Sequence, residues 1–309
     1  MSRLSRRAVG VLGGIAWDRV VSEPPSPWHP VGWFGRAMTR LEEHTWADAR
    51  TPGIWYALVG TVVGAGSGSL VGSTAVALGV CIAGTELRRV AATIEAAVRD
   101  GNLGAARTLM PALVGRDPSG LDESQICAAV IESLAENTVD AVIAPMCWAW
   151  WWGAPGAGVY RAINTMDAMV GHHSERYERF GWAAARLDDV ANYVPARVFA
   201  VMTALSAPRT SREVWRIVRR DASKHPSPNA GVAECAVAAA LGLRLGGTLR
   251  YGERVEHRPL LGDGATPGPQ DVARAIALTA RTEFLLTLLA GMVALSPLMA
   301  PKHSASPRT

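Results

Sequence analysis

The sequence is short of charge. Asp, Glu, Lys and Arg make up 19% of its 309 residues, whereas soluble chains average about 25%. None of these four residue types occurs in three long stretches, 51–85, 141–160 and 284–301. Because an uncharged apolar stretch of about 18 residues is long enough to cross a bilayer, the pattern argues against an ordinary soluble domain. It predicts a protein of the cell membrane with several crossings.

Cysteine is also scarce, and the phosphate-binding loop GxxxxGK[ST] is missing. The four cysteines, at 81, 127, 147 and 235, form no CxxC pair and lie inside apolar runs. Cysteine in such runs behaves as a small hydrophobic residue, so a zinc site or a disulfide scaffold is disfavoured. Without the loop, any nucleotide must be held in another way.

The net charge of +4 does not indicate nucleic-acid binding. The arginines alternate with acidic residues, and no aromatic–basic motif accompanies them. An arginine excess is typical of cytoplasmic segments of membrane proteins. The basic start, Met1 to Arg7, precedes a short apolar run as in a signal peptide, but Asp18 and Arg19 follow without a cleavage site. We therefore expect a retained first helix over 8–17.

Hydrophobic periodicity predicts an all-α, polytopic membrane protein in one domain, residues 1–309. Amphipathic helices and long polar loops are expected to form a cytoplasmic-side active site. Pro145 should end a helix that begins at Asp122, and the tryptophans that follow it suit a membrane interface. The other expected elements are helices over 34–47, 86–100 and 230–243, a tight two-helix hairpin over 54–83, a Trp-rich span over 147–152, a loop over 246–270, and a helix from 272 into the span 284–301. One tilted helix would also fit 54–83, but we favour the hairpin because it returns both flanking polar segments to the same side.

The helix after Asp122 carries a stripe of acids. At 100° per residue, Glu132, Glu136 and Asp140 fall within an arc of about 80°, with Asn137 beside them. Like charges at this spacing repel, so the stripe calls for a compensating cation. The alternative is a solvated face of a surface helix, which the Trp-rich run that follows disfavours.

Two further segments combine carboxylates with amides at helical spacing. Asn164 and Asp167 are three residues apart, and Asp188 and Asn192 are four apart, with Arg186 and Asp189 beside them. Such oxygens are hard ligands that suit Mg²⁺, which takes one or two carboxylates and leaves other positions to phosphate and water. The adjacent pair at 172 and 173 is a weak metal site, because neighbouring histidines point to different sides of any regular element.

The segment KHPSPNAG at 224–231 is typical of an anion site. Ser227 or Asn229 can cap the helix that follows, whose N-terminus favours negative charge. Lys224 adds a cation, and His225 lies beside it. The alternative is a plain capped loop.

Taken together, these motifs resemble one family, the adenosylcobinamide-phosphate synthases, membrane amide ligases of cobalamin biosynthesis. The resemblance covers almost the whole chain. The motifs that carry it are HPVGWFGR at 29–36, VGRDPSGLDE at 114–123, ESLAENTVDAVIAP at 132–145, YRAINTMDAMVGHHSERYERFGWAAARLDDVANYVPAR at 160–197, KHPSPNAGVAECA at 224–236, LGGTLRYGE at 245–253 and RPLLGDG at 258–264. Ala168, His172 and His173 depart from the family pattern, which argues against catalytic roles for those positions.

The resemblance implies an ATP-dependent ligase. It would join the propionate side chain of adenosylcobyric acid to (R)-1-aminopropan-2-ol or its phosphate, giving adenosylcobinamide or its phosphate. A carboxylate and an amine only form a salt at neutral pH, so activation as an acyl phosphate is needed. That chemistry calls for Mg²⁺ on the phosphates, cations for the transferred charge and a base for the ammonium.

We assign the roles as a hypothesis that the resemblance does not fix. Mg²⁺ goes to Asp140, Asp188 and Asp189. The catalytic set is Glu132, Glu136, Asp140 and Lys224, with Glu132 or Glu136 as the base. Substrate and phosphate contacts, many of them amides suited to the amide-rimmed corrinoid, go to Asn137, Arg161, Asn164, Asp167, Arg186, Asn192, His225, Ser227 and Asn229.

The expected partners are the corrinoid, the aminopropanol substrate and the lipid bilayer, with other late cobalamin-assembly enzymes as candidates and an oligomer allowed.

Two other functions fit parts of the pattern. A Mg-dependent membrane prenyl- or alcohol-phosphate transferase also places Asp-rich helices at the membrane face. A membrane sensor without enzymatic activity is the second, although it would not need these combined acid and amide sets.

Overall fold

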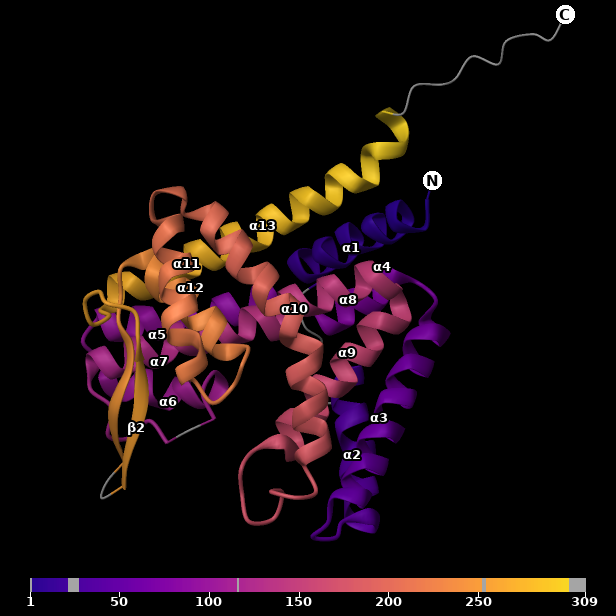
Figure 1. Ribbon diagram of the computed structural model, residues 1–309, viewed down its shortest axis with the longest axis horizontal. Helices are drawn as coiled ribbons and strands as arrows, with labels where there is room; N and C mark the ends of the chain where they lie inside the picture. The colour runs from indigo at the N-terminus through magenta and orange to yellow at the C-terminus, as the bar shows by residue number, and fades with distance from the viewer. Residues whose placement is uncertain (1, 22–27, 116, 252–253, 300–309) are drawn as a thin grey trace, which may run out of the picture.

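The computed structural model describes residues 2–21, 28–115, 117–251 and 254–299 (Figure 1). Its described part is helical apart from one two-stranded hairpin and an isolated bridge, which confirms the predicted all-α class. In Figure 1 the hairpin lies at the left, α2 and α3 lie at the right, and α10 runs between them. The elements are α1 (Arg3–Val20), α2 (Pro30–Thr45), α3 (Arg50–Val71), α4 (Thr74–Cys81), α5 (Gly84–Arg99), α6 (Leu103–Leu109), η2 (Met110–Ala112), α7 (Glu123–Thr138), η3 (Val139–Ile143), α8 (Ala144–Trp152), α9 (Ala154–Met166), η4 (Asp167–Gly171), α10 (Trp182–Ser206), η5 (Pro208–Thr210), α11 (Ser211–Asp221), η6 (Ala222–Lys224), α12 (Ala230–Leu241), β1 (Leu245–Tyr251), β2 (Arg254–Leu261) and α13 (Pro269–Met299).

Two helices of the described chain are long and apolar enough to cross a membrane. They are α3 and the part of α13 from Pro269 to Ser296. A third candidate is the pair α10 and Pro208–Lys224, which is bent by 107°. The uncharged stretches 51–85 and 284–301 thus contribute to candidate spans. The stretch 141–160 does not form a span of its own, because it is divided between η3, α8 and α9.

Residues 54–83 do not form the expected two-helix hairpin. Instead, α3 continues through its glycines to Val71, and α4 has only 8 residues. The glycines serve close packing, because α3 lies against α9. A Cβ on Gly64 would come within 2.6 Å of the Gly158 carbonyl oxygen. Small residues at such a contact let two helix backbones approach.

We expected the helix that begins after Asp122 to end before Pro145, but it continues past this proline. The helical path continues from α7 through the π-helical η3 into α8. Proline has no N–H, so the carbonyl of Ala141 loses its usual helical partner. The backbone N–H of Ala83 donates to that carbonyl at 3.0 Å instead. A neighbouring segment therefore satisfies the group that the proline leaves free.

The loop predicted over 246–270 is wrong for most of its length. It contains the antiparallel hairpin β1–β2, with Gly247 paired to Arg258 and a register shift between Leu245 and Gly247. A structureless loop of about 20 residues is itself uncommon inside a compact chain. The length of the predicted loop was therefore the one signal for regular structure. The strand pattern itself was weak, because glycines and Pro259 interrupt it.

Candidate active-site cleft

A small cleft collects polar side chains from three separate segments. Its volume is about 20 Å³, roughly the room of one water-sized group. Glu136 and Asp140 come from α7 and η3, and Asp188 and Asn192 come from α10. The remaining lining residues are Val139, Ser227, Asn229, Ala230 and Ala233. Most of these positions lie on helices, so the site is not built by long polar loops as we had predicted.

A hydrogen-bonded chain orders the acids of the cleft. The Asn192 amide donates to Asp188 Oδ2 at 2.9 Å, and the Tyr160 hydroxyl donates to Asn192 Oδ1 at 2.9 Å. The same hydroxyl lies 3.5 Å from Asp140 Oδ1. Asn192 and Tyr160 are buried. The carboxylates of Asp140 and Asp188 are therefore held by buried groups with fixed positions.

Asn164 extends this chain toward a cation. Its amide donates to Asp188 Oδ1 at 3.4 Å, and its Oδ1 accepts from Arg161 Nη1 at 3.1 Å. Arg161 also donates to the carbonyl of Cys81. The predicted pair Asn164 and Arg161 thus reaches the cleft through Asp188 and does not line it.

Two of the acids lie on π-helical turns and have unusual pKa values. Burial, with the nearby carboxylates of Asp188 and Glu136, raises the pKa of Asp140 well above its usual range. Burial raises the pKa of Asp167 to about 7, with smaller contributions from the carboxylates of Asp188, Asp189 and Glu136. Single π-turns are frequent at functional sites. The acids are crowded and desolvated, so a bound cation would favour their charged forms.

The segment before α12 supplies the third wall of the cleft. The Ser227 hydroxyl accepts from the backbone N–H groups of Asn229 and Ala230, at 3.3 and 3.1 Å, so it satisfies the first N–H of α12 from the preceding loop. The N-cap itself is Asn229, whose side chain makes no capping bond within the described residues. The Asn229 amide donates to the Asp189 carbonyl at 2.8 Å, and its oxygen accepts from Arg197 at 2.8 Å. These bonds attach the loop to α10 and fix the mouth of the cleft.

Glu132 lies apart from the cleft, although it shares the helix with Glu136. Its side chain is buried; Oε1 accepts from the Gly246 N–H at 2.8 Å, and Oε2 lies 3.4 Å from Arg258. Glu132 therefore anchors the start of the hairpin. Glu136 is exposed on the cleft. Of the two predicted bases, only Glu136 is placed to meet a substrate there.

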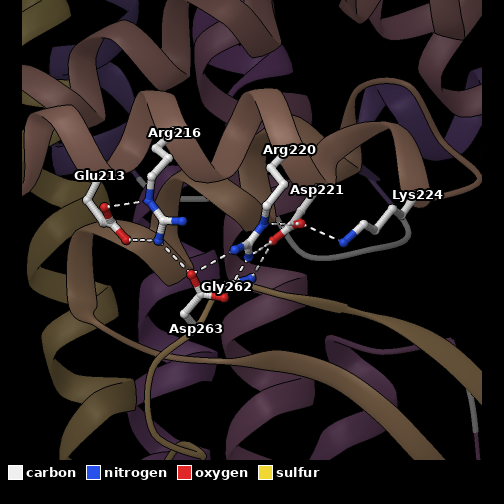
Figure 2. Close-up of polar contacts among 7 residues, drawn as sticks. All are labelled: Glu213, Arg216, Arg220, Asp221, Lys224, Gly262 and Asp263. Atoms are coloured by element: carbon white, nitrogen blue, oxygen red, sulfur yellow. Dashed lines mark hydrogen bonds and ion pairs between the residues drawn. The ribbon is translucent and has the colours of Figure 1, made fainter.

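Lys224 also lies outside the cleft, in an ion-pair cluster that Figure 2 shows. Its ammonium is 2.7 Å from Oδ1 of the fully buried Asp221. Asp221 also pairs with Arg220 at 2.7 Å and accepts from the Gly262 N–H at 3.0 Å. Asp263 joins the cluster through Arg220 and Arg216. The cluster fastens the end of the hairpin to α11, and Lys224 belongs to it.

The other predicted residues lie around the cleft without lining it. His225 is half-buried, with Nδ1 accepting from the Ser227 N–H at 3.0 Å and Nε2 lying 3.7 Å from Glu234. The Asn137 amide donates to Ser133, one turn back on α7. Arg186 is exposed and pairs with Asp189 at 2.9 Å.

The predicted three-carboxylate metal set does not come together. Within the described chain, no group of three or more His, Cys, Asp or Glu side chains is arranged to hold a metal ion. Asp188 and Asp189 are neighbours on a helix and diverge by about 100°, and Asp189 turns to Arg186. Of the three predicted ligands, Asp140 and Asp188 line the cleft together, with Glu136 as a third carboxylate beside them. Such a pair fits Mg²⁺, which commonly takes one or two carboxylates and the phosphates of its substrate.

Two residues that order the site give no signal in the sequence. Tyr160 bonds Asn192, and Arg197 bonds Asn229. Both lie at the ends of the motif at 160–197, yet a tyrosine beside an apolar run and an arginine on a helix usually belong to the core or the surface. Only their contacts with other segments distinguish them.

The fold and cleft define a helical protein with candidate membrane spans and a buried acid–amide site. The chain belongs to the CobD/Cbib protein family, whose sequence profile matches residues 11–279. A Mycobacterium tuberculosis relative, called cobalamin biosynthesis protein CobD, is 45% identical over 302 residues, covering 93% of this chain and 96% of its own length.

Two other relatives support the same membership. The Rhodobacter capsulatus cobalamin biosynthesis protein CobD is 40% identical, with 93% of this chain and 95% of the relative covered. The Salmonella arizonae cobalamin biosynthesis protein CbiB is 37% identical, with 85% and 91% covered. No solved structure matches the chain.

Proposed function

We propose that this protein acts in cobalamin biosynthesis as an ATP-dependent amide ligase. It joins the propionate carboxyl of adenosylcobyric acid to (R)-1-aminopropan-2-ol or its phosphate. One observation carries the proposal: Asp140, Asp188, Asn192 and Asn229, from three separate motifs, meet at a single cleft. Family membership favours this function over a prenyl-phosphate transferase or a sensor.

The reaction needs two transfers. In the first, a propionate oxygen bonds to the γ-phosphorus of ATP, and the bond to the bridging oxygen breaks to release ADP. In the second, the amine nitrogen bonds to the acyl carbon, and inorganic phosphate leaves with the electron pair of the C–O bond. The amine arrives as an ammonium ion and must lose a proton before attack. Positioning and charge stabilisation supply most of the catalysis in such phosphoryl transfers.

Glu136 is the residue best placed to accept that proton. Its carboxylate is exposed on the cleft beside Asp140. A general base must reach the proton directly or through one water. The amides of Asn192 and Asn229 are buried and held by Tyr160 and Arg197. They suit the orientation of phosphate or substrate amide groups.

Asp140 and Asp188 are the residues that would hold Mg²⁺. When bound, the ion supplies charge neutralisation on the transferring phosphoryl group. The two carboxylates share the cleft, and burial and mutual repulsion disfavour charge on Asp140 in the absence of a cation. Asn192 and Asn164 hold Asp188 through one oxygen each, at 2.9 and 3.4 Å. These contacts orient the carboxylate toward a ligand.

The test is a reconstituted reaction with the full chain in detergent. Adenosylcobyric acid, Mg-ATP and aminopropanol phosphate are supplied, with free aminopropanol in a parallel reaction. We expect an amide product and one ADP for each amide formed. Product without ATP consumption would contradict the ligase assignment, as would the absence of product with both amines. The ratio of the two rates identifies the amine that the enzyme uses.

A further inference from the structure

A larger cavity lies next to the cleft, and the proposed roles do not use it. Its volume is about 410 Å³, and its walls come from α2, α3, α4 and α9. Nearly all of the wall is apolar, with Val31, Trp33, Phe34 and Val63 among its side chains. Apart from Ala37, the residues from α2 belong to the motif at 29–36, whose purpose the sequence alone did not explain. Cavities of this size and lining typically bind the apolar part of a ligand.

One cation stands in this apolar wall. Arg161 is the charged residue of the lining. Among the described residues, the hydrogen bonds of its guanidinium go to neutral groups, the Asn164 side chain and the Cys81 carbonyl. Its Nε atom is buried and has no hydrogen-bond partner in the part of the chain that the structure describes. A buried donor left without a partner destabilises the folded state, so the position favours an acceptor that arrives with a ligand.

Arg161 also connects the cavity to the acids of the cleft. Asn164 Oδ1 accepts a hydrogen bond from Arg161 at 3.1 Å, and the Asn164 amide donates to Asp188 at 3.4 Å. A carboxylate bound by Arg161 would therefore be separated from Asp188, the proposed Mg²⁺ ligand, by the Asn164 side chain alone. The cavity lies on one side of this chain and the polar cleft on the other.

We infer that this cavity receives the apolar flank of the acid substrate, with the reacting carboxylate at Arg161. The inference rests on the proposed function and adds to it the place of the acid. An acid ligand complements the site in both respects, since its apolar part fills an apolar cavity and its charge meets the buried guanidinium. The volume holds only part of a corrinoid, so the amide-bearing remainder stays outside the cavity.

Bulky substitutions on the cavity wall test the inference without touching the acids. Ser67 lies on α3, lines the cavity and is exposed at its edge. Ser67→Trp should fill part of the volume. Val62→Trp is the matched control, because Val62 is 61% exposed on the same helix and does not line the cavity. Ala37→Trp, on the opposite wall from α2, repeats the test if the first variant does not fold.

The measurement is binding of adenosylcobyric acid to the full chain in detergent, without ATP. Equilibrium dialysis follows the visible absorbance of the corrin ring. We expect Kd to rise about tenfold or more in Ser67→Trp and Ala37→Trp, which corresponds to about 1.4 kcal/mol, and to change by less than about twofold in Val62→Trp. Arg161→Gln should weaken binding of the acid more than binding of an analogue whose propionate is already amidated.

Two outcomes would overturn the inference. One is unchanged binding of the acid in both folded cavity variants. The other is the loss of co-purified phospholipid in those variants with acid binding unchanged, which would make the cavity a lipid site. A failure of the proposed function gives a different result, because wild-type protein would then bind the acid but form no amide when Mg-ATP and amine are added.

Discussion

The hydroxyl of Tyr160 donates to the side-chain oxygen of Asn192 at 2.9 Å, which leaves the Asn192 amide to hold Asp188. The two residues come from α9 and α10, and both are buried. This bond fixes which end of the Asn192 side chain faces the acid. Groups that orient a ligand of a metal commonly change affinity or activity by about 10–100-fold.

Tyr160→Phe should therefore slow amide formation about tenfold. The loss should be larger at low Mg²⁺ than at saturating Mg²⁺, because the variant loosens a proposed Mg²⁺ ligand. Tyr177→Phe is the matched control, since the Tyr177 hydroxyl bonds Glu42 at 2.9 Å, outside the cleft. Rates over a Mg²⁺ titration give the comparison. Equal rates for Tyr160→Phe and wild type would show that the bond has no part in the reaction.

Neutralising either cleft acid should abolish most activity while the fold is kept. We expect Asp140→Asn and Asp188→Asn to reduce amide formation at least about 100-fold. Thermal stability should be unchanged or higher, since each substitution removes one of several crowded carboxylates. Asp117→Asn is the control, because Asp117 is exposed and its carboxylate accepts from the Ser119 N–H and hydroxyl, outside the cleft. Activity near that of wild type in either cleft variant would remove the acid from the mechanism.

Asp167 should make the stability of the protein depend on pH. The folded-state pKa is about 7, against an ordinary value of 3.8. Between these values the folded chain binds a proton that the unfolded chain has released, so stability falls as pH rises toward 7. The slope for one proton is about 1.4 kcal/mol per pH unit. Below 3.8 the group contributes no pH dependence, and above 7 the loss is complete.

Asp167→Asn should remove this dependence. Thermal unfolding from pH 4 to pH 8, without divalent cations, should show the variant gaining on wild type up to about pH 7 and no further. Parallel curves for the two proteins would mean that Asp167 does not titrate in this range.

Glu132 and Glu136 should separate into structural and catalytic roles. Glu136→Gln should lose amide formation with little effect on unfolding, because its side chain is exposed on the cleft. Glu132→Ala should destabilise the protein by about 1–3 kcal/mol, since it leaves the Gly246 N–H without its acceptor. Turnover per folded molecule and denaturation curves distinguish the two effects. The reverse pattern would show that the hairpin anchor, not the cleft residue, takes part in the chemistry.

Lys224 should prove dispensable for catalysis. Its ammonium pairs with Asp221 and is about half exposed, with 49% of the side chain accessible. Lys224→Met should cost roughly 0–1 kcal/mol and leave the rate within about twofold of wild type. Asp221→Ala should be more harmful, by about 1–3 kcal/mol, because it leaves the buried Gly262 N–H without its acceptor. A large rise in KM for ATP in Lys224→Met would show that Lys224 does bind the phosphates of ATP.

Sequence patterns predicted the positions of most helices and several walls of the cleft. The pairs Asn164–Asp167 and Asp188–Asn192 were recognisable because helical spacing places them on one face. The split between Glu132 and Glu136 was not, since it depends on a hairpin that begins 114 residues further along the chain and whose strands the sequence pattern does not predict. Lys224 was predicted at the anion site for a similar reason. Its partner, Asp221, lies in a segment rich in arginine, where the sequence gives no sign that this acid is buried.

The arrangement of the acids around a cation could be predicted only in part. A helical wheel assumes one constant period, which gives Glu132, Glu136 and Asp140 a common face. The assignment of Asp189 to Mg²⁺ came from its carboxylate oxygens and not from helical spacing. In the structure Asp189 turns to Arg186. Tyr160 and Arg197 carried no sign of their roles, because each acts through an amide of a different segment.

Asp140 and Asp167 each lie where a helix takes up an additional residue, in η3 and η4. A π-turn adds one residue to the helix without adding a turn. Deleting one residue inside Val139–Ile143 would therefore restore a regular α-helix with α8 still facing nearly as it does now. The additional residue changes the direction in which Asp140 points without rotating the helix that follows, so this deletion should cost activity while the packing of the α8 tryptophans is kept.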